Sequence, residues 1–202
     1  MLFFMDNGLT KMKKIQFYSK LGVDGAIIDF ESTHWDARIG EIITAGFLSQ
    51  SEFTILQRLE STEESFKKRV IEEMKTKKKP WYAFNKKIEE GFCGLEVDCD
   101  LQENRESSFI ALRDSGLLEH YNLLGDPLDG KEIPRFWKAW KSTKDILFVS
   151  KIVRHNYCCL AKEYYLKLKR IDKLDSNMIE KFLPSAPIEK LEIRKQLGLT
   201  FQ

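Results

Sequence analysis

Apolar and polar positions along the chain divide it into strand-like and helix-like segments. Runs rich in β-branched and aromatic residues, bounded by polar or turn residues, are typical of strands. The candidate strands are residues 26–31, 39–48, 52–59, 81–84 and 95–101. Because only Ser49–Ser51 separates the second from the third, we predict that the first three form an antiparallel meander. Residues 15–18 are a candidate edge strand in an N-terminal arm.

Helix-like segments alternate with the later strands. In these segments apolar residues recur with a spacing near that of one helical turn. The candidate helices are residues 61–79, 86–92, 136–140 and 142–170. Ser61 with Glu64, and Ser142 with Asp145, have the spacing of a helix cap and its partner. Strands followed by helices that alternate with strands predict a three-layer α/β domain with a mixed sheet.

Composition and charge narrow the class of protein. The chain has 202 residues, of which 43% are hydrophobic and 32% charged, so one domain can bury a sizeable core. Lys and Arg number 33 against 31 Asp and Glu, so a nucleic-acid partner would need a local basic patch. No apolar stretch approaches the ~18 residues of a membrane span, and Met1–Met5 is too short for a signal segment. The four cysteines form no Cys-x-x-Cys motif, so we expect a cytoplasmic protein without a disulfide framework.

Two carboxylates follow the most apolar candidate strand. Asp29 and Glu31 come directly after Ala26–Ile28 and project from the same face, because side chains alternate along a strand. Phe30, between them, points into a core on the opposite face. Two carboxylates on so apolar a strand repel each other unless a cation lies between them. We therefore predict a divalent-metal site; the alternative is that the strand ends here and both acids are solvated.

Three residues further along the chain are candidates for the same site. Glu89 lies in the segment 86–92, where an acid also suits the helix dipole, so a surface role is the alternative. His155 and Cys159 are four residues apart and share a helix face. A single histidine on an apolar helix is more often a hydrogen-bonded packing residue than a catalyst.

Four segments, taken in order, resemble the ribonuclease H-like superfamily of DEDD (DnaQ-like) 3′–5′ exonucleases, especially an uncharacterised prokaryotic branch of predicted ribonuclease-H-like proteins. The resemblance covers about residues 24–168. Residues 27–33 (Ile-Ile-Asp-Phe-Glu-Ser-Thr) look like the first motif, an apolar strand ending in Asp-x-Glu. Residues 82–89 are similar to the second motif. Residues 125–130 and 154–159 look like segments of the prokaryotic branch, where a His-Asn-x-x-Asp sequence supplies the last metal ligand.

Carried over position by position, the resemblance implies a role for each of these residues. Asp29, Glu31 and Glu89 fall on the first three metal ligands, with Glu89 replacing the common aspartate. His155 matches a polar residue that helps to position the attacking water. Cys159 falls where the final aspartate belongs, which is a serious departure because cysteine is a poor ligand for Mg²⁺.

Other side chains could complete the site or hold a substrate. Asp98 or Asp100 could replace the missing fourth ligand, although both are as readily explained as surface acids at a strand end. Lysine and arginine side chains would hold phosphates, and an aromatic ring would stack on a base. The candidate nucleic-acid contacts are Tyr82, Asn85, Lys86, Lys87, Arg154 and Asn156. The alternative for Trp81 and Tyr82 is that at least one of them lies in the core.

The resemblance implies a ribonuclease H-like fold with a mixed central sheet of about five strands. This domain would span residues 23–170, after an N-terminal arm or edge strand (1–22) and before a C-terminal extension (171–202). The implied activity is hydrolysis of phosphodiester bonds at the 3′ end of single-stranded nucleic acid, with Mg²⁺ or Mn²⁺ as two ions.

A second function is compatible with the same fold. With one ligand lost at Cys159, the chain could be a catalytically degenerate module that binds nucleic acid or a protein without cutting. The aromatic segment 136–140 would be the element that docks a protein partner. At helical spacing, however, such a segment is more typical of a core.

Overall fold

The computed structural model describes residues 12–179 and 193–198; the remaining residues of the N-terminal arm and the C-terminal extension lie outside this description. Within it, four strand elements form one mixed sheet in the order β2-β1-β3-β4. Their bounds are β1 Met12–Ser32, β2 Ile42–Arg58, β3 Trp81–Ala83 and β4 Cys99–Asp100. β1 and β2 pair antiparallel, whereas β3 and β4 continue the sheet in parallel. The predicted mixed sheet is therefore confirmed.

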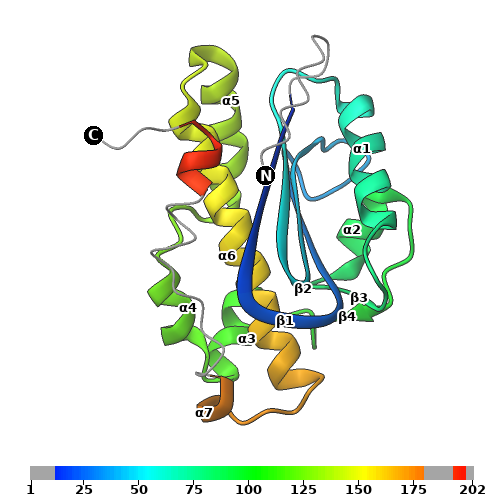
Figure 1. The fold of residues 1–202 in the computed structure, drawn as a ribbon, viewed down its shortest axis with the longest axis vertical. Helices are drawn as coiled ribbons and strands as arrows, with labels where there is room; N and C mark the ends of the chain where they lie inside the picture. The colour runs from blue at the N-terminus through cyan, green and yellow to red at the C-terminus, as the bar shows by residue number, and fades with distance from the viewer. Residues whose placement is uncertain (1–11, 180–192, 199–202) are drawn as a thin grey trace.

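The two long strands bend back on themselves, with β2 inside β1 (Figure 1). Met12–Tyr18 pairs with the second arm of β2, and Ala26–Ser32 pairs with its first arm. The two arms of β2 are joined by side chains, since Gln57 donates to the Ile43 carbonyl. The predicted antiparallel pairing of the first two candidate strands is confirmed, because Ala26–Ser32 of β1 pairs with the first arm of β2. The predicted three-strand meander is wrong, because 39–48 and 52–59 belong to one strand and Ser49–Ser51 lies within it instead of forming a turn. The candidate edge strand 15–18 is the first part of β1, which continues past residue 22.

Helices connect and cover these strands. Their bounds are α1 Glu63–Lys75, α2 Lys86–Cys93, α3 Ser108–Asp114, α4 Leu118–Leu124, the 3-10 helix η1 Gly130–Glu132, α5 Ile133–Thr143, α6 Ile146–Arg170 and α7 Ser176–Ile179. Two predicted helix caps were placed on the wrong residue. Thr62, rather than Ser61, caps α1 by accepting from the Ser65 amide. Asp145 is itself the cap of α6, since its carboxylate accepts from the Leu147 amide.

The molecule has three layers (Figure 1). α1 and α2 cover one face of the sheet, and α6, with the helices before it, covers the other. Each interface encloses its own hydrophobic core; Phe30 belongs to the α1–α2 side, whereas Ile27 belongs to the α6 side. The alternation along β1 therefore turns Asp29 and Glu31 toward α6, as predicted.

Peripheral segments add to the core on the α6 face. Trp137 and Trp140 of α5 are buried there, so the aromatic segment is part of the core rather than an exposed docking element. From the C-terminal extension, Ile179, Ile193 and Leu197 join the same core. In the described part of the chain, no helix is long and apolar enough to cross a membrane.

Candidate metal centre

Asp29 and Glu31 lie at the carboxyl end of β1. Glu31 is 8% exposed and Asp29 is half-buried. The two carboxyl groups lie close enough to interact electrostatically. Burial and the nearby Asp29 raise the pKa of Glu31 to about 8, against the opposing effect of His155. The predicted pair of carboxylates is therefore close, buried and short of positive charge.

Asn156 on α6 holds Asp29 in place. Its amide nitrogen donates to the Asp29 carbonyl at 3.0 Å and to Asp29 Oδ2 at 2.6 Å. This approach depends on Gly46 of β2, where an added Cβ would lie 2.1 Å from Asn156 Oδ1. Asn156 is fully buried. Asn156 therefore holds Asp29 in position, whereas the sequence predicted that it contacts nucleic acid.

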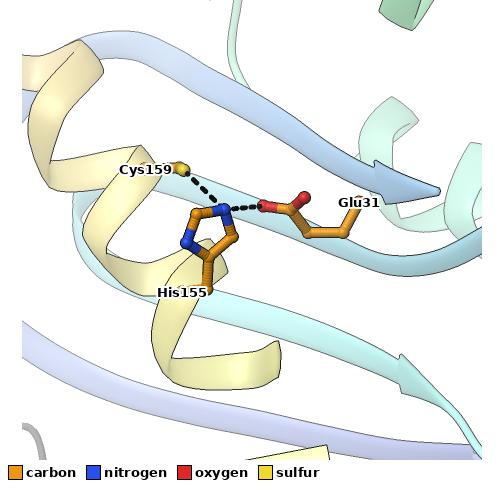
Figure 2. A group of neighbouring side chains, drawn as sticks. All are labelled: Glu31, His155 and Cys159. Carbon is orange, nitrogen blue, oxygen red and sulfur yellow. Dashed lines mark hydrogen bonds and ion pairs between the residues drawn. The ribbon is translucent and has the colours of Figure 1, made fainter. Parts of the chain in front are cut away.

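His155 lies between Glu31 and Cys159 (Figure 2). On its other side it contacts Asp126, in the loop that precedes η1. Its Nδ1 lies 2.8 and 2.9 Å from the two carboxylate oxygens of Asp126. Its Nε2 lies 3.5 Å from Glu31 Oε1 and 3.6 Å from Cys159 Sγ. Burial disfavours the imidazolium, but Cys159, Glu31 and Asp126 outweigh burial and raise the pKa of His155 to about 12.

Asp126 is itself held by two donors. The Tyr121 hydroxyl and the Leu128 amide both donate to its carboxylate. Sequence reasoning missed Asp126 as a member of the site, although it lies in the segment 125–130 that resembled the prokaryotic branch. It is 29 residues from His155 along the chain, so no local spacing could have paired them.

Two further buried glutamates lie within the electrostatic influence of Asp29. Glu89 on α2 is 4% exposed and Glu163 on α6 is 2% exposed. Within the described residues, the Oε2 atom of each has no hydrogen-bond partner. Burial and the charge of Asp29 raise the pKa of both well above the ordinary value. Buried carboxylate oxygens without donors are where a cation gains most.

Glu163 was missed by sequence reasoning, which took Cys159 as the last ligand position. The signal was present, because Glu163 follows Cys159 by four residues and so shares its helix face. The centre therefore receives carboxylates from three elements: Asp29 and Glu31 from β1, Glu89 from α2 and Glu163 from α6.

Lys162 brings a positive charge into this cluster. Its ammonium group is buried and donates to Cys159 Sγ at 3.3 Å. Burial disfavours the charged form, but Cys159, Asp29 and Glu163 outweigh it and hold the pKa of Lys162 above its ordinary value. Burial raises the pKa of the Cys159 thiol, while His155 and Lys162 oppose that shift. The cluster thus carries part of its own countercharge.

The predicted nucleic-acid contacts do not converge on the centre as a group. Tyr82, like Trp81, is buried in the core, and the Lys167 ammonium lies 5.3 Å from the centre of its ring. Lys86 donates to the Val97 carbonyl, and Arg154 donates to the Gly125 carbonyl.

Asn85 and the exposed Lys87 instead line a groove of about 390 Å³ between α2 and the loop after β1. The loop after β1 forms the opposite wall with Trp35, which is 71% exposed. Lys87 and Asn85 are therefore the predicted contacts that a substrate could reach.

Asp98 and Asp100 are occupied elsewhere. Asp98 accepts from the Trp81 amide and pairs with Lys79, while Asp100 accepts from the Asn85 amide. Both act as strand-end acids, the alternative that the sequence left open. The fourth carboxylate of the cluster comes from Glu163 instead.

No family model, curated protein or solved structure matches this chain. What the centre can do is therefore read from its chemistry. A Glu31–His155–Cys159 group, with ligand atoms within 4.8 Å of one another, could hold a metal ion. Asp29, Glu89 and Glu163 influence one another electrostatically, and carboxylate oxygens are the hard ligands that divalent cations such as Mg²⁺ prefer.

Proposed function

We propose that this protein is a divalent-metal-dependent nuclease that hydrolyses phosphodiester bonds at the 3′ end of single-stranded nucleic acid. The observation that supports it is that the buried Glu89 and Glu163 both feel the charge of Asp29, and that one oxygen of each has no hydrogen-bond partner among the described residues. A buried carboxylate oxygen without a hydrogen-bond donor lowers the stability of the folded protein. Binding cations and a phosphate offsets that cost.

Each side chain has a part in this chemistry. Bound divalent ions would activate water and stabilise charge on the leaving oxygen. Asp29 and Glu31 would hold the ions, and Asn156 fixes the position of Asp29 by its two hydrogen bonds. His155, oriented by Asp126, would align the attacking water or accept its proton.

The groove between α2 and the loop after β1 is suited to a single strand of nucleic acid. Trp35 offers an exposed ring for stacking on a base, and Lys87 offers a cation for the backbone. Base–aromatic stacking tolerates any sequence, which fits a strand end better than a defined duplex site. The resemblance of the motifs to 3′–5′ exonucleases supplies the polarity of the reaction.

Lys162 favours a second candidate function, a non-catalytic module of the same fold. Its buried ammonium group already neutralises part of the acidic cluster, where a second ion would otherwise act. Together with Cys159 at the expected aspartate position, this arrangement would suit binding of a nucleic-acid end without cleavage.

The test uses end-labelled single-stranded DNA and RNA oligonucleotides with Mg²⁺ or Mn²⁺. We expect stepwise loss from the 3′ end, abolished by EDTA and reduced roughly 10²–10³-fold by Asp29→Asn. Asp98→Asn is the matched control, because Asp98 is engaged by Lys79 and the Trp81 amide; it should keep activity.

The outcomes separate the two functions. Equal cleavage by wild type and Asp29→Asn would overturn the nuclease. Binding of strand ends without cleavage, with cleavage gained in Cys159→Asp, would establish the degenerate module.

A further inference from the structure

The most complete constellation in the molecule is the group that surrounds His155 Nε2. Glu31 Oε1 and Cys159 Sγ approach this nitrogen from β1 and α6 (Figure 2). All three ligand atoms lie within 4.8 Å of one another, and all three side chains are buried. Oxygen, nitrogen and sulfur are the three donor types that zinc accepts in proteins.

The separations fit a tetrahedral ion. Zinc–nitrogen, zinc–sulfur and zinc–oxygen bonds at a tetrahedral angle place the donors about 3.5 Å apart for N and S and about 3.4 Å apart for N and O. The observed values are 3.6 Å from Nε2 to Cys159 Sγ and 3.5 Å from Nε2 to Glu31 Oε1. The side chains would need only small shifts to share one ion.

The tautomer of His155 also suits a metal. Asp126 already accepts from the Tyr121 hydroxyl and the Leu128 amide, so its carboxylate acts as an acceptor. The Nδ1 proton of His155 is thus directed to Asp126, and an ion held by Glu31 and Cys159 would take the place of the proton on Nε2. A carboxylate behind a metal-binding histidine is the usual arrangement that fixes its orientation and strengthens the ligand.

We propose that Glu31, His155 and Cys159 form a site for a thiophilic divalent ion, Zn²⁺ or a similar transition metal, with Asp126 and Tyr121 as its supporting residues. Three protein ligands leave one coordination position open, as in catalytic rather than structural zinc sites. Asp29 lies near enough to Glu31 to raise the pKa of its carboxyl group. Thiolate selects Zn²⁺ over Mg²⁺, so Cys159 is a ligand suited to a different metal rather than a lost aspartate.

This inference deepens the proposed nuclease by naming one of its ions, and only the catalytic use of that ion rests on the proposed function. In this site His155 is a ligand, so the water would be activated on the metal instead of by the imidazole. Lys162, which donates to Cys159 Sγ, would remain beside the thiolate and compensate its charge.

The test is a Co²⁺ titration of metal-free protein, followed by displacement with Zn²⁺. We expect a thiolate-to-cobalt charge-transfer band and intense tetrahedral absorption that saturate at one ion per chain. Cys159→Ser should abolish the charge-transfer band. Cys158→Ser is the matched control, because Cys158 is the adjacent buried residue in the core and lies outside the cluster; it should keep the band.

A second measurement keeps the test decisive if a variant is poorly folded. In wild type, Zn²⁺ should protect one thiol from alkylation, and peptide mapping should identify it as Cys159. Asp126→Asn should weaken Zn²⁺ binding about 10–100-fold while keeping the band, as expected for a supporting residue.

The results distinguish this site from the nuclease proposal. A cobalt band without hydrolysis upholds the metal site and removes the nuclease. Hydrolysis with Mg²⁺, no cobalt band and no protection of Cys159 removes the metal site, and identifies the cluster as hydrogen bonded without a metal.

Discussion

Two buried glutamates on opposite faces of the sheet have opposite surroundings. Glu73 on α1 is 4% exposed and Glu163 on α6 is 2% exposed. Glu73 is met by Lys77 at 2.9 Å and by Lys14 at 3.0 Å. Burial alone would raise the pKa of Glu73, but these lysines hold it below the ordinary value. The pKa of Glu163 is raised well above that value, and its Oε2 has no hydrogen-bond partner in the described residues.

The difference shows that burial alone does not mark a functional carboxylate. Glu73 is compensated within the fold and acts as a structural link between α1 and the edge of β1. Glu163 is only partly compensated by Lys162, because Asp29 and Glu89 add like charge around it. A buried acid that the fold leaves uncompensated retains capacity for an external cation.

The largest difference in stability is expected between the amide variants of these two acids. Glu73→Gln should lower the free energy of unfolding by about 3 kcal/mol, because the nearly buried Lys77 loses its nearer carboxylate and keeps only Glu52 at 3.8 Å. Glu163→Gln should cost less than about 1 kcal/mol or even stabilise, since a neutral amide resembles the protonated carboxyl group that burial favours. Urea unfolding of both variants in EDTA measures this. Equal losses would mean that Glu163 is compensated as well as Glu73.

Cation binding should also distinguish Glu73 from Glu163. A divalent ion at 100 times its dissociation constant should stabilise wild type by about 2.7 kcal/mol. Glu73→Gln should keep this increment, although it starts from a lower stability, whereas Glu163→Gln should lose part of it. Thermal unfolding with and without Mn²⁺ or Zn²⁺ provides the measurement, and an identical increment in both variants would contradict a role for Glu163.

The two acids should give stability opposite dependences on pH in the metal-free protein. Glu73 has a lowered pKa, so its contribution is present above the ordinary pKa of 4.5 and is lost as the solution becomes more acidic. Glu163 and Glu31 have raised pKa values, so folding binds protons and stability falls as pH rises, between 4.5 and about 8 for Glu31.

Stability curves of the two amide variants against pH separate these contributions. Glu73→Gln should lose acid sensitivity, and Glu163→Gln should lose part of the decline toward neutral pH. A wild-type stability that rises steadily from pH 4.5 to about 8 in EDTA would contradict the raised pKa values at the centre.

The smallest effect is expected from Lys14→Met. The Lys14 side chain is 34% exposed, and Lys77 remains to compensate Glu73. Partly exposed ion pairs contribute little, so the loss should be at most about 1 kcal/mol. A loss as large as that of Glu73→Gln, measured by urea unfolding, would make Lys14 the main partner of Glu73.

Much of the sheet could be predicted from the pattern of apolar and polar residues along the chain. The apolar runs predicted the antiparallel pairing of β1 with β2, although the chain continues as one strand where a turn was expected at Ser49–Ser51. The alternation in β1 predicted that Asp29 and Glu31 face away from Phe30, because a strand has a fixed period of two. Helix ends were less certain. Ser61 and Thr62 are both good capping residues, and only the backbone geometry of Thr62 selects between them.

The composition of the centre was harder to predict because its members lie far apart in sequence. Asp29, Glu31, Glu89 and His155 were predicted because motifs carry them at recognisable spacings, and the structure shows that all but the half-buried Asp29 are buried. Glu163 was not predicted, because Cys159, one turn earlier on the same helix, matched the expected position of the last ligand. Asp126 was missed as a partner of His155 because it lies in a loop that only the fold brings to α6.

The sequence by itself determined the layered α/β order and the pair of acids at the end of β1, since both depend on short-range periodicity. Only the tertiary structure decided which residues surround that pair. Asn156 packs on Gly46, and this contact fixes how α6 lies on the sheet. That position turns His155, Cys159 and Glu163 together toward β1, because residues four apart share a face and only packing decides where the face points.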